Sequence, residues 1–174
     1  MKLKGKKVAI LVEHHYQDLE VWFPYYRLKE EGAEVIFVGT GSAPSYQGKF
    51  GYPAAPDTTA DKIKTKDLDA VIIPGGWAPD FLRRYASVIK LVREMDVKGK
   101  IIASICHGGW VLASAEIIRE RTVTSFSAIR DDLTHAGAKY VDREVQVDKN
   151  LITSRNPDDL PAFCREIISA LAKA

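Results

Sequence analysis

Short β-branched runs alternate with longer helix-like stretches along this chain, and this alternation constrains its fold more than any single motif does. Four such runs predict strands, at Lys7–Val12, Glu34–Val38, Leu68–Ile73 and Lys100–Ile105. Apolar residues at helical spacing predict intervening helices, at Leu19–Glu31 and Ser87–Lys98. Alternating strands and helices are typical of a parallel sheet with helices on both faces. The expected fold class is therefore α/β.

The rest of the chain extends this pattern. Residues 39–62 are rich in Gly, Pro and Ser and predict turns, with a hairpin around Lys49–Tyr52. A helix is expected to start at His107 and to extend toward Glu120. Further elements are predicted at Thr122–Phe126, Ile129–Ala136, Lys139–Val141, Glu144–Val147 and Leu151–Ser154, followed by a last helix from near Asn156 to Ala174. At 174 residues the chain is expected to form one domain over residues 1–174.

Charge, hydropathy and cysteine content bear on partners and compartment. The formal charge of +2 is small and the charged residues are interspersed, which argues against nucleic acid as a partner. No apolar run approaches the roughly 20 residues of a membrane span, and the first residues lack a signal-peptide core. Two cysteines, Cys106 and Cys164, make no disulfide framework and suit a reducing compartment. A cytoplasmic protein without a membrane partner is expected.

Three loops are expected to form the ligand-binding edge of the sheet. In open parallel sheets, ligands bind beyond the carboxyl ends of the strands. Glu13–Asp18, Pro74–Asp80 and Cys106–Gly109 each follow a predicted strand and therefore come to this edge. Backbone N–H groups of the Gly75-Gly76 turn, with that of His107, are candidates for an oxyanion hole, although Pro-Gly-Gly is also an ordinary turn.

Cys106 lies in the stretch ASICHGGWVLA, between a buried strand and a helix-like run. This arrangement is typical of a nucleophile elbow, where the helix N-terminus favours the reactive thiolate. Gly108 and Gly109 permit close approach of a substrate or of another backbone segment. A buried, inert thiol is the alternative interpretation. Since adjacent residues of a helix do not face each other, His107 is not expected to pair tightly with Cys106.

Four stretches span nearly the whole chain: YQDLEVWFPYYRLKEEGAEV, LDAVIIPGGWAPDFLR, IIASICHGGWVLASAEIIR and DDLTHAGAKYVDREVQVDKNLITSRNPDDLPAF. Together they resemble the PfpI-type intracellular cysteine peptidases, whose superfamily includes the parkinsonism-associated deglycases. The resemblance implies a flavodoxin-like three-layer sandwich with Cys106 at the elbow. Class I glutamine amidotransferase domains share this fold, but their downstream H-x-E motif is absent from this chain.

The resemblance also implies roles for four residues. Cys106 corresponds to the nucleophile and His107 to the histidine of the triad. Glu20 corresponds to a carboxylic acid that contacts the sulfur and has a raised pKa; the alternative is an exposed glutamate in the first turn of a helix. Asp80 corresponds to a carboxylate that orients the histidine of a neighbouring subunit. The expected state is therefore a homo-oligomer, a dimer or a hexamer, that shares Asp80 across its interface.

The pocket departs from the family pattern. Gln17 replaces an acid, His14 and His15 replace acidic or amide residues, and Phe126 replaces a tyrosine. Gly109 replaces the proline of the family, and Trp110 follows it. Substrate-binding candidates therefore include two loop aromatics, Trp77 and Trp110, together with Gly108, Phe126, His14 and His15. The adjacent histidines lack the spacing of metal ligands, so no metal or cofactor is expected.

Two enzymatic functions and one non-enzymatic function fit these residues. A glyoxalase or deglycase would add the Cys106 thiolate to a small carbonyl substrate or to a glycated adduct, with stress protection as its role. A peptidase would form an acyl-enzyme with a peptide substrate. A redox sensor or stress chaperone would use only the oxidation of Cys106. The bulk of Trp77 and Trp110 favours small carbonyl substrates.

Overall fold

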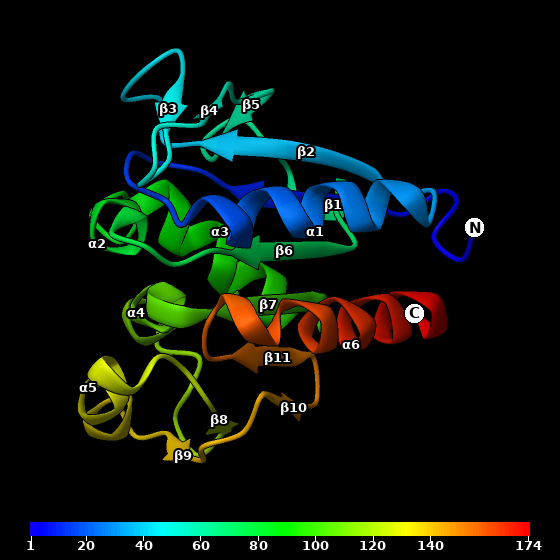
Figure 1. The fold of residues 1–174 in the computed structure, drawn as a ribbon. Helices are drawn as coiled ribbons and strands as arrows, with labels where there is room; N and C mark the ends of the chain where they lie inside the picture. The colour runs from blue at the N-terminus through cyan, green and yellow to red at the C-terminus, as the bar shows by residue number, and fades with distance from the viewer.

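Seven strands form the central sheet of the computed structural model, which describes residues 1–174 (Figure 1). Their order is β10-β11-β7-β6-β1-β2-β5, and only the β10–β11 pair is antiparallel. The strands are β1 Lys7–Leu11, β2 Glu34–Gly39, β5 Thr58–Thr59, β6 Ala70–Ile73, β7 Ile101–Ile105, β10 Val145–Asp148 and β11 Leu151–Ser154. The predicted α/β class with a mostly parallel sheet is confirmed.

Helices cover both faces of the sheet and give the three layers of a flavodoxin-like sandwich. The first and last helices, α1 (Asp18–Glu30) and α6 (Leu160–Lys173), lie side by side on one face, and α3 (Ala86–Val97) lies on the other (Figure 1). Because the inner strands are covered on both sides, their sequences are continuously apolar. One cluster of 47 buried apolar residues joins the layers. No helix has the length and apolar character needed to cross a membrane.

Several small elements differ from their predicted form. The hairpin in residues 39–62 is confirmed as β3 (Tyr46–Gln47) with β4 (Pro53–Ala54), but the same stretch also supplies β5 to the main sheet. The strands predicted within 122–126 and 139–141 are only β8 (Thr122–Val123) and β9 (Lys139–Tyr140), which pair with each other outside that sheet. The predicted helix at 129–136 is confirmed as α5 (Arg130–His135).

The helix predicted from His107 toward Glu120 is shorter than expected. Cys106–Gly108 forms a 3₁₀ turn, and α4 spans only Gly109–Ser114. Glu116 then adopts a φ of 59°, a left-handed conformation that a helix does not continue through. A further helix, α2 (Ala78–Leu82), was not predicted; it carries a proline in its first turn, where the missing N–H is harmless.

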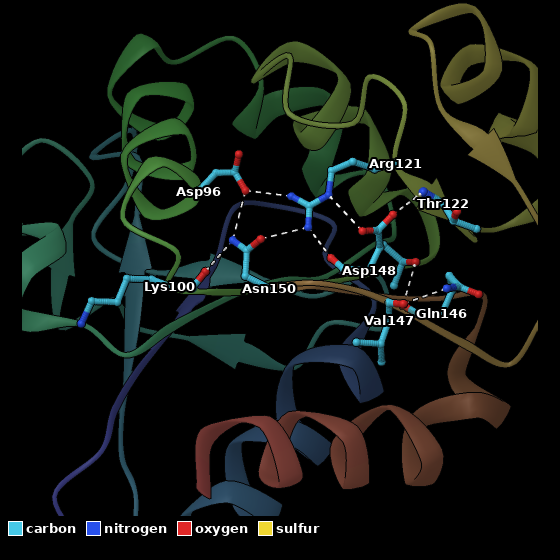
Figure 2. Close-up of polar contacts among 9 residues, drawn as sticks. Asp96, Lys100, Arg121, Thr122, Gln146, Val147, Asp148 and Asn150 are labelled. Carbon is cyan, nitrogen blue, oxygen red and sulfur yellow. Dashed lines mark hydrogen bonds and ion pairs between the residues drawn. The ribbon is translucent and has the colours of Figure 1, made fainter. Parts of the chain in front are cut away.

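A polar network ties together the amino ends of β7 and β11 (Figure 2). Arg121 donates to Asp96 Oδ1 and to Asn150 Oδ1, both at 2.9 Å. Asn150 in turn donates to Asp96 Oδ1 at 3.0 Å and to the carbonyl of Lys100 at 2.9 Å. The backbone carbonyl of Asp148 also accepts from Arg121, and the carboxylate of Asp148 lies 3.9 Å from Arg121 Nε. This set of five residues, the Arg121 network, fixes α3, β7 and the β10–β11 turn to one another.

Candidate active site

The three predicted site loops meet at the carboxyl ends of β1, β6 and β7. Gly76 forms an isolated antiparallel bridge with Tyr16, and the N–H of Trp77 donates to the carbonyl of His15 at 2.8 Å. Gly76 has a φ of +72°, and a Cβ there would lie 2.3 Å from the carbonyl oxygen of His15. Only glycine therefore fits at this position, and the turn it forms directs backbone N–H groups toward the end of β7.

Cys106 stands at a strained turn directly after β7. Its φ is 60°, a conformation that costs about 1–2 kcal/mol for most L-residues. Gly75 lies against it, since a Cβ on Gly75 would come 2.6 Å from Cys106 Cβ and 2.9 Å from Sγ. Behind the turn, a Cβ on Gly108 would lie 2.6 Å from the carbonyl oxygen of Ile73. The geometry is that of a nucleophile elbow, and the close approach at Gly108 is made by the backbone of Ile73 and the side chain of Ser104.

The ring of His107 contacts the sulfur of Cys106, with Nδ1 3.3 Å from Sγ. The expectation that these adjacent side chains do not pair was wrong. It assumed helical geometry, whereas the left-handed backbone of Cys106 turns its side chain toward the next residue. Burial, and secondly the positive charge of Lys49, lower the pKa of His107. The imidazole is therefore neutral at pH 7 and able to accept a proton.

Glu20 brings a buried carboxyl group from the first turn of α1. Its side chain is fully buried, its Oε2 accepts from the N–H of Gly75 at 2.6 Å, and its Oε1 has no hydrogen-bond partner. Burial raises the pKa of Glu20 to about 7, although the hydrogen bond from Gly75 lowers it. The alternative of an exposed glutamate was therefore wrong, and this carboxyl group holds or releases a proton near neutral pH.

Cys106 and Glu20 form a coupled pair. A Cβ on Gly75 would lie 2.9 Å from the sulfur of Cys106 and 2.7 Å from Oε2 of Glu20, so both groups border the same small space. Burial, then the negative charge of Glu20, raise the pKa of Cys106, whereas the N–H groups of Gly76 and His107 lower it. Burial thus opposes the thiolate that the helix N-terminus was expected to favour. Protonation of Glu20 favours the thiolate because it removes the repulsion between two negative charges, while burial continues to raise the pKa of Cys106.

Three aromatic side chains surround His107. Phe126 stacks against its ring with centroids 5.1 Å apart, and Trp110 meets it edge-on, also at 5.1 Å. Trp77 lies 5.8 Å away and is 55% exposed. The structure thus brings all three predicted aromatic candidates around the imidazole of His107, which itself contacts the sulfur of Cys106.

Asp80 does not contact His107 within the chain. It lies on α2 and forms an ion pair with Arg84, and the side chain of Asp80 is 44% exposed. No hydrogen bond or ion pair joins Asp80 to His107. Within one chain, Asp80 therefore does not orient His107 by direct contact.

The two predicted loop histidines lie apart from the sulfur. His14 Nδ1 accepts from the N–H of Gln47 at 3.3 Å, and its ring meets Tyr46 edge-on. His15 is exposed and faces Phe81, with ring centroids 6.1 Å apart. Neither ring contacts Cys106. The structure therefore does not bring these two predicted site residues to the sulfur.

Two further side chains near the site were not found from the sequence. Lys49, at the tip of the β3–β4 hairpin, lowers the pKa of both Glu20 and His107 through its positive charge. Asp132 on α5 accepts from Trp110 Nε1 at 2.7 Å. Lys49 lies outside the four family-like stretches, and Asp132 lies in one of them without an assigned role. Each reaches the site only through tertiary contacts between distant segments.

The model of the DJ-1/PfpI family matches residues 6–170. The chain belongs to the DJ-1/PfpI family. The protein named Deglycase PH1704, from Pyrococcus horikoshii, is 42% identical over 165 residues, which cover 95% of this chain and 99% of that protein. Deglycase PfpI, from Pyrococcus furiosus, is 40% identical over 165 residues with the same coverage. Membership of this family, together with relatives named deglycases, is consistent with an enzymatic, protective role.

A solved structure from Anabaena variabilis shows the same fold. It superposes with a TM-score of 0.94 at 42% identity, and the match covers 95% of this chain. That protein has two domains, one DJ-1/ThiJ/PfpI-like and one ferritin-like, and the present chain spans 50% of its length. The likeness therefore concerns the DJ-1/PfpI-like half of that protein.

Proposed function

We propose that this chain is a cysteine-dependent enzyme of the glyoxalase or deglycase type, which converts reactive carbonyl compounds or their amine adducts to hydroxy acids. The observation that carries the proposal is the contact of Cys106 Sγ with His107 Nδ1 at 3.3 Å, at a left-handed elbow. A buried acid, Glu20, lies beside the sulfur, and the N–H groups of Gly76 and His107 point toward it. These groups lie close together, which supports their proposed roles as nucleophile, base, acid and oxyanion donors.

The first step forms a bond between sulfur and carbon. The Cys106 thiolate adds to the aldehyde carbon of an α-oxoaldehyde, and the π electrons move to the oxygen. The N–H groups of Gly76 and His107 stabilise the oxyanion, which takes the proton held by Glu20. With a glycated amine, the sulfur displaces the amine instead, and the C–N bond breaks with proton delivery from Glu20 or His107.

The second step moves hydrogen from the former aldehyde carbon of the α-oxoaldehyde to the neighbouring carbonyl carbon. His107 removes the C–H proton from the carbon bound to sulfur and returns it to the adjacent carbonyl carbon. The hydroxyl on the carbon bound to sulfur gives up its proton to the adjacent oxygen, so that a C=O bond forms on the first carbon as the other C=O bond is lost. One carbon is oxidised to a thioester and its neighbour is reduced to an alcohol, so no external oxidant is needed. Water then attacks the thioester, the C–S bond breaks, and a hydroxy acid leaves as the thiolate is restored.

The shape of the site supports a small substrate. Cys106 is only 8% exposed, and the rings of Trp77, Trp110 and Phe126 stand around its histidine partner. Two relatives that match nearly the whole chain are named deglycases. Two unpaired, buried cysteines also fit a reducing compartment such as the cytoplasm.

We further propose that the site is completed by a second copy of the chain. Asp80 is exposed and contacts no group of its own site, and it is the residue that the family resemblance assigns to the partner's histidine. A homo-oligomer in which Asp80 reaches the partner's site would orient the imidazole through its free nitrogen.

Turnover of methylglyoxal tests the proposed function. Wild type is expected to consume many equivalents and release lactate, whereas Cys106→Ser is expected to lose at least about 1,000-fold in rate. Cys164→Ala, which alters the other buried cysteine, is the matched control and is expected to keep full activity. Consumption that stops near one equivalent would instead indicate a reactive but non-catalytic thiol, as a redox sensor requires.

A further inference from the structure

Trp110 connects an acidic side chain on α5 to the ring of His107. Its Nε1–H donates to Asp132 Oδ2 at 2.7 Å, and its ring meets the imidazole edge-on at 5.1 Å. Trp110 lies in the first turn of α4, directly after the elbow, so a rotation of the indole would change the space beside His107. The hydrogen bond to Asp132 restricts that rotation because it fixes the far edge of the indole.

A third helix also holds the indole. Arg83, at the end of α2, places its guanidinium 5.8 Å from the centre of the Trp110 ring. Arg83 is itself fixed to α4, since its Nε donates to Ser114 Oγ at 2.9 Å. The Trp110 ring is therefore held by groups from α2 and α5 while it covers one side of the imidazole.

His107 has no carboxylate partner within the chain. Its contacts are the sulfur of Cys106 and the rings of Phe126, Trp110 and Trp77. We propose that Asp132 is a positioning residue, which acts through Trp110 to hold the imidazole of His107 against Cys106. The proposal rests on the proposed function, because it explains how the acid–base group of that reaction is oriented inside a single protomer.

Asp132 acts on His107 through the indole and not through its own charge, because the pKa of His107 is shifted by burial and by the charge of Lys49. Holding the indole in place excludes water and lowers that pKa. The other charged groups near His107 are Cys106 with Glu20, the ammonium of Lys49, and Arg83 across the indole. None of these groups is removed when Asp132 is replaced, so a change in the pKa of His107 reports the release of the indole.

Titration of His107 by NMR in three variants tests the proposal. In Asp132→Ala, the indole is freed, and the pKa of His107 is expected to rise toward its ordinary value. In Asp132→Asn, the amide oxygen still accepts from the indole, so the pKa is expected to stay near that of wild type. Asp131→Ala is the matched control, because Asp131 is exposed on the same helix and pairs only with Arg130. It is expected to have no effect.

A double-mutant cycle with Trp110 tests whether Asp132 acts on His107 through the indole. Trp110→Phe keeps an aromatic ring but loses the N–H, and it is expected to match Asp132→Ala in both the His107 pKa and turnover, with kcat about fivefold lower and KM little changed. Adding Asp132→Ala to Trp110→Phe is expected to change nothing more. Additive effects would overturn the proposal, as would a His107 pKa that falls or stays unchanged in Asp132→Ala. The titration needs no substrate, so it gives its answer even if the protein fails to turn over methylglyoxal.

Discussion

Polar groups are buried at both ends of the central sheet, but their hydrogen-bond and ion-pair partners differ between the two ends. In the Arg121 network at the amino ends, an arginine side chain that is 12% exposed meets Asp96, Asp148 and Asn150 (Figure 2). At the carboxyl ends, Glu20 is fully buried with one oxygen unpartnered, and Cys106 has a strained backbone. The first cluster pairs its cation with two carboxylates, although Arg121 Nε has no hydrogen-bond partner. The second retains a cysteine with a strained backbone and an acid that has no ion-pair partner.

This difference has a physical reason. A buried charge with matching partners holds segments together, and removing one partner is strongly destabilising. A buried acid without full hydrogen bonding destabilises the fold when it ionises. The same burial raises its pKa, so the acid can give up or take up a proton near neutral pH. The carboxyl-end cluster is therefore expected to respond to pH and to substrate, and the amino-end cluster to respond to neither.

Arg121→Met is expected to give the largest effect on stability. It leaves Asp96 and Asp148 without their cation, and we expect the free energy of unfolding to fall by about 4 kcal/mol. Turnover of the folded protein is expected to stay within twofold, because the network lies at the opposite end of the strands. Urea unfolding with an activity assay on the same samples checks both. Arg119→Met, an exposed neighbour without an ion pair, is the control.

Glu20→Gln is expected to change how stability depends on pH. The pKa of Glu20 is raised from 4.5 to about 7, so between these values the folded state holds a proton that the unfolded state has lost. Wild-type stability should therefore fall as pH rises through this window, by about 3 kcal/mol from this group. In Glu20→Gln, the free energy of unfolding, measured in urea at pH 5 and pH 8, should not show this decrease. The same slope in both proteins would show that Glu20 does not hold this proton.

Asp80→Ala is expected to reduce turnover about tenfold while alkylation of Cys106 by iodoacetamide stays fast. The reason is that Asp80 is proposed to orient the partner's histidine and has no contact with the sulfur of its own chain. Size-exclusion chromatography with light scattering establishes that the variant still assembles. Equal losses of turnover and alkylation would assign Asp80 to folding or assembly instead.

Phe126→Tyr is expected to have the smallest effect, a change in kcat/KM of no more than about threefold. The Phe126 ring is 38% exposed and stacks on His107, so an added hydroxyl would meet solvent at the mouth of the site. Steady-state kinetics on methylglyoxal checks this prediction. A change beyond tenfold would mean that the ring edge contacts the reacting groups.

The inner strands were predictable because burial on both faces leaves a continuous apolar run in the sequence. Leu151–Ser154 was predicted with its observed bounds, and the third and fourth predicted strands end where β6 and β7 end. The α2 helix was missed because five residues are too few to show helical periodicity. Strands β8 and β9 were overestimated because their apolar residues pack outside the main sheet.

The site was only partly readable from the sequence. The strand-to-helix junction marked Cys106, but the burial of Glu20 beside it was implied only by the family resemblance. The pairing of His107 with Cys106 was missed because it depends on one left-handed φ angle, which no helical spacing rule reports. Asp132 and Lys49 were missed because each reaches the site from a distant element through tertiary contacts.

Rapid quenching with intact-mass analysis is the most direct test of cysteine-dependent carbonyl chemistry. Wild-type protein mixed with methylglyoxal is expected to show a covalent adduct that maps to Cys106, forms before lactate appears, and decays at the rate of turnover. The Cys106→Ser variant should show neither adduct nor lactate. Lactate formation without an adduct on Cys106, or an adduct that persists while turnover continues, would contradict the assignment of this cysteine as the nucleophile.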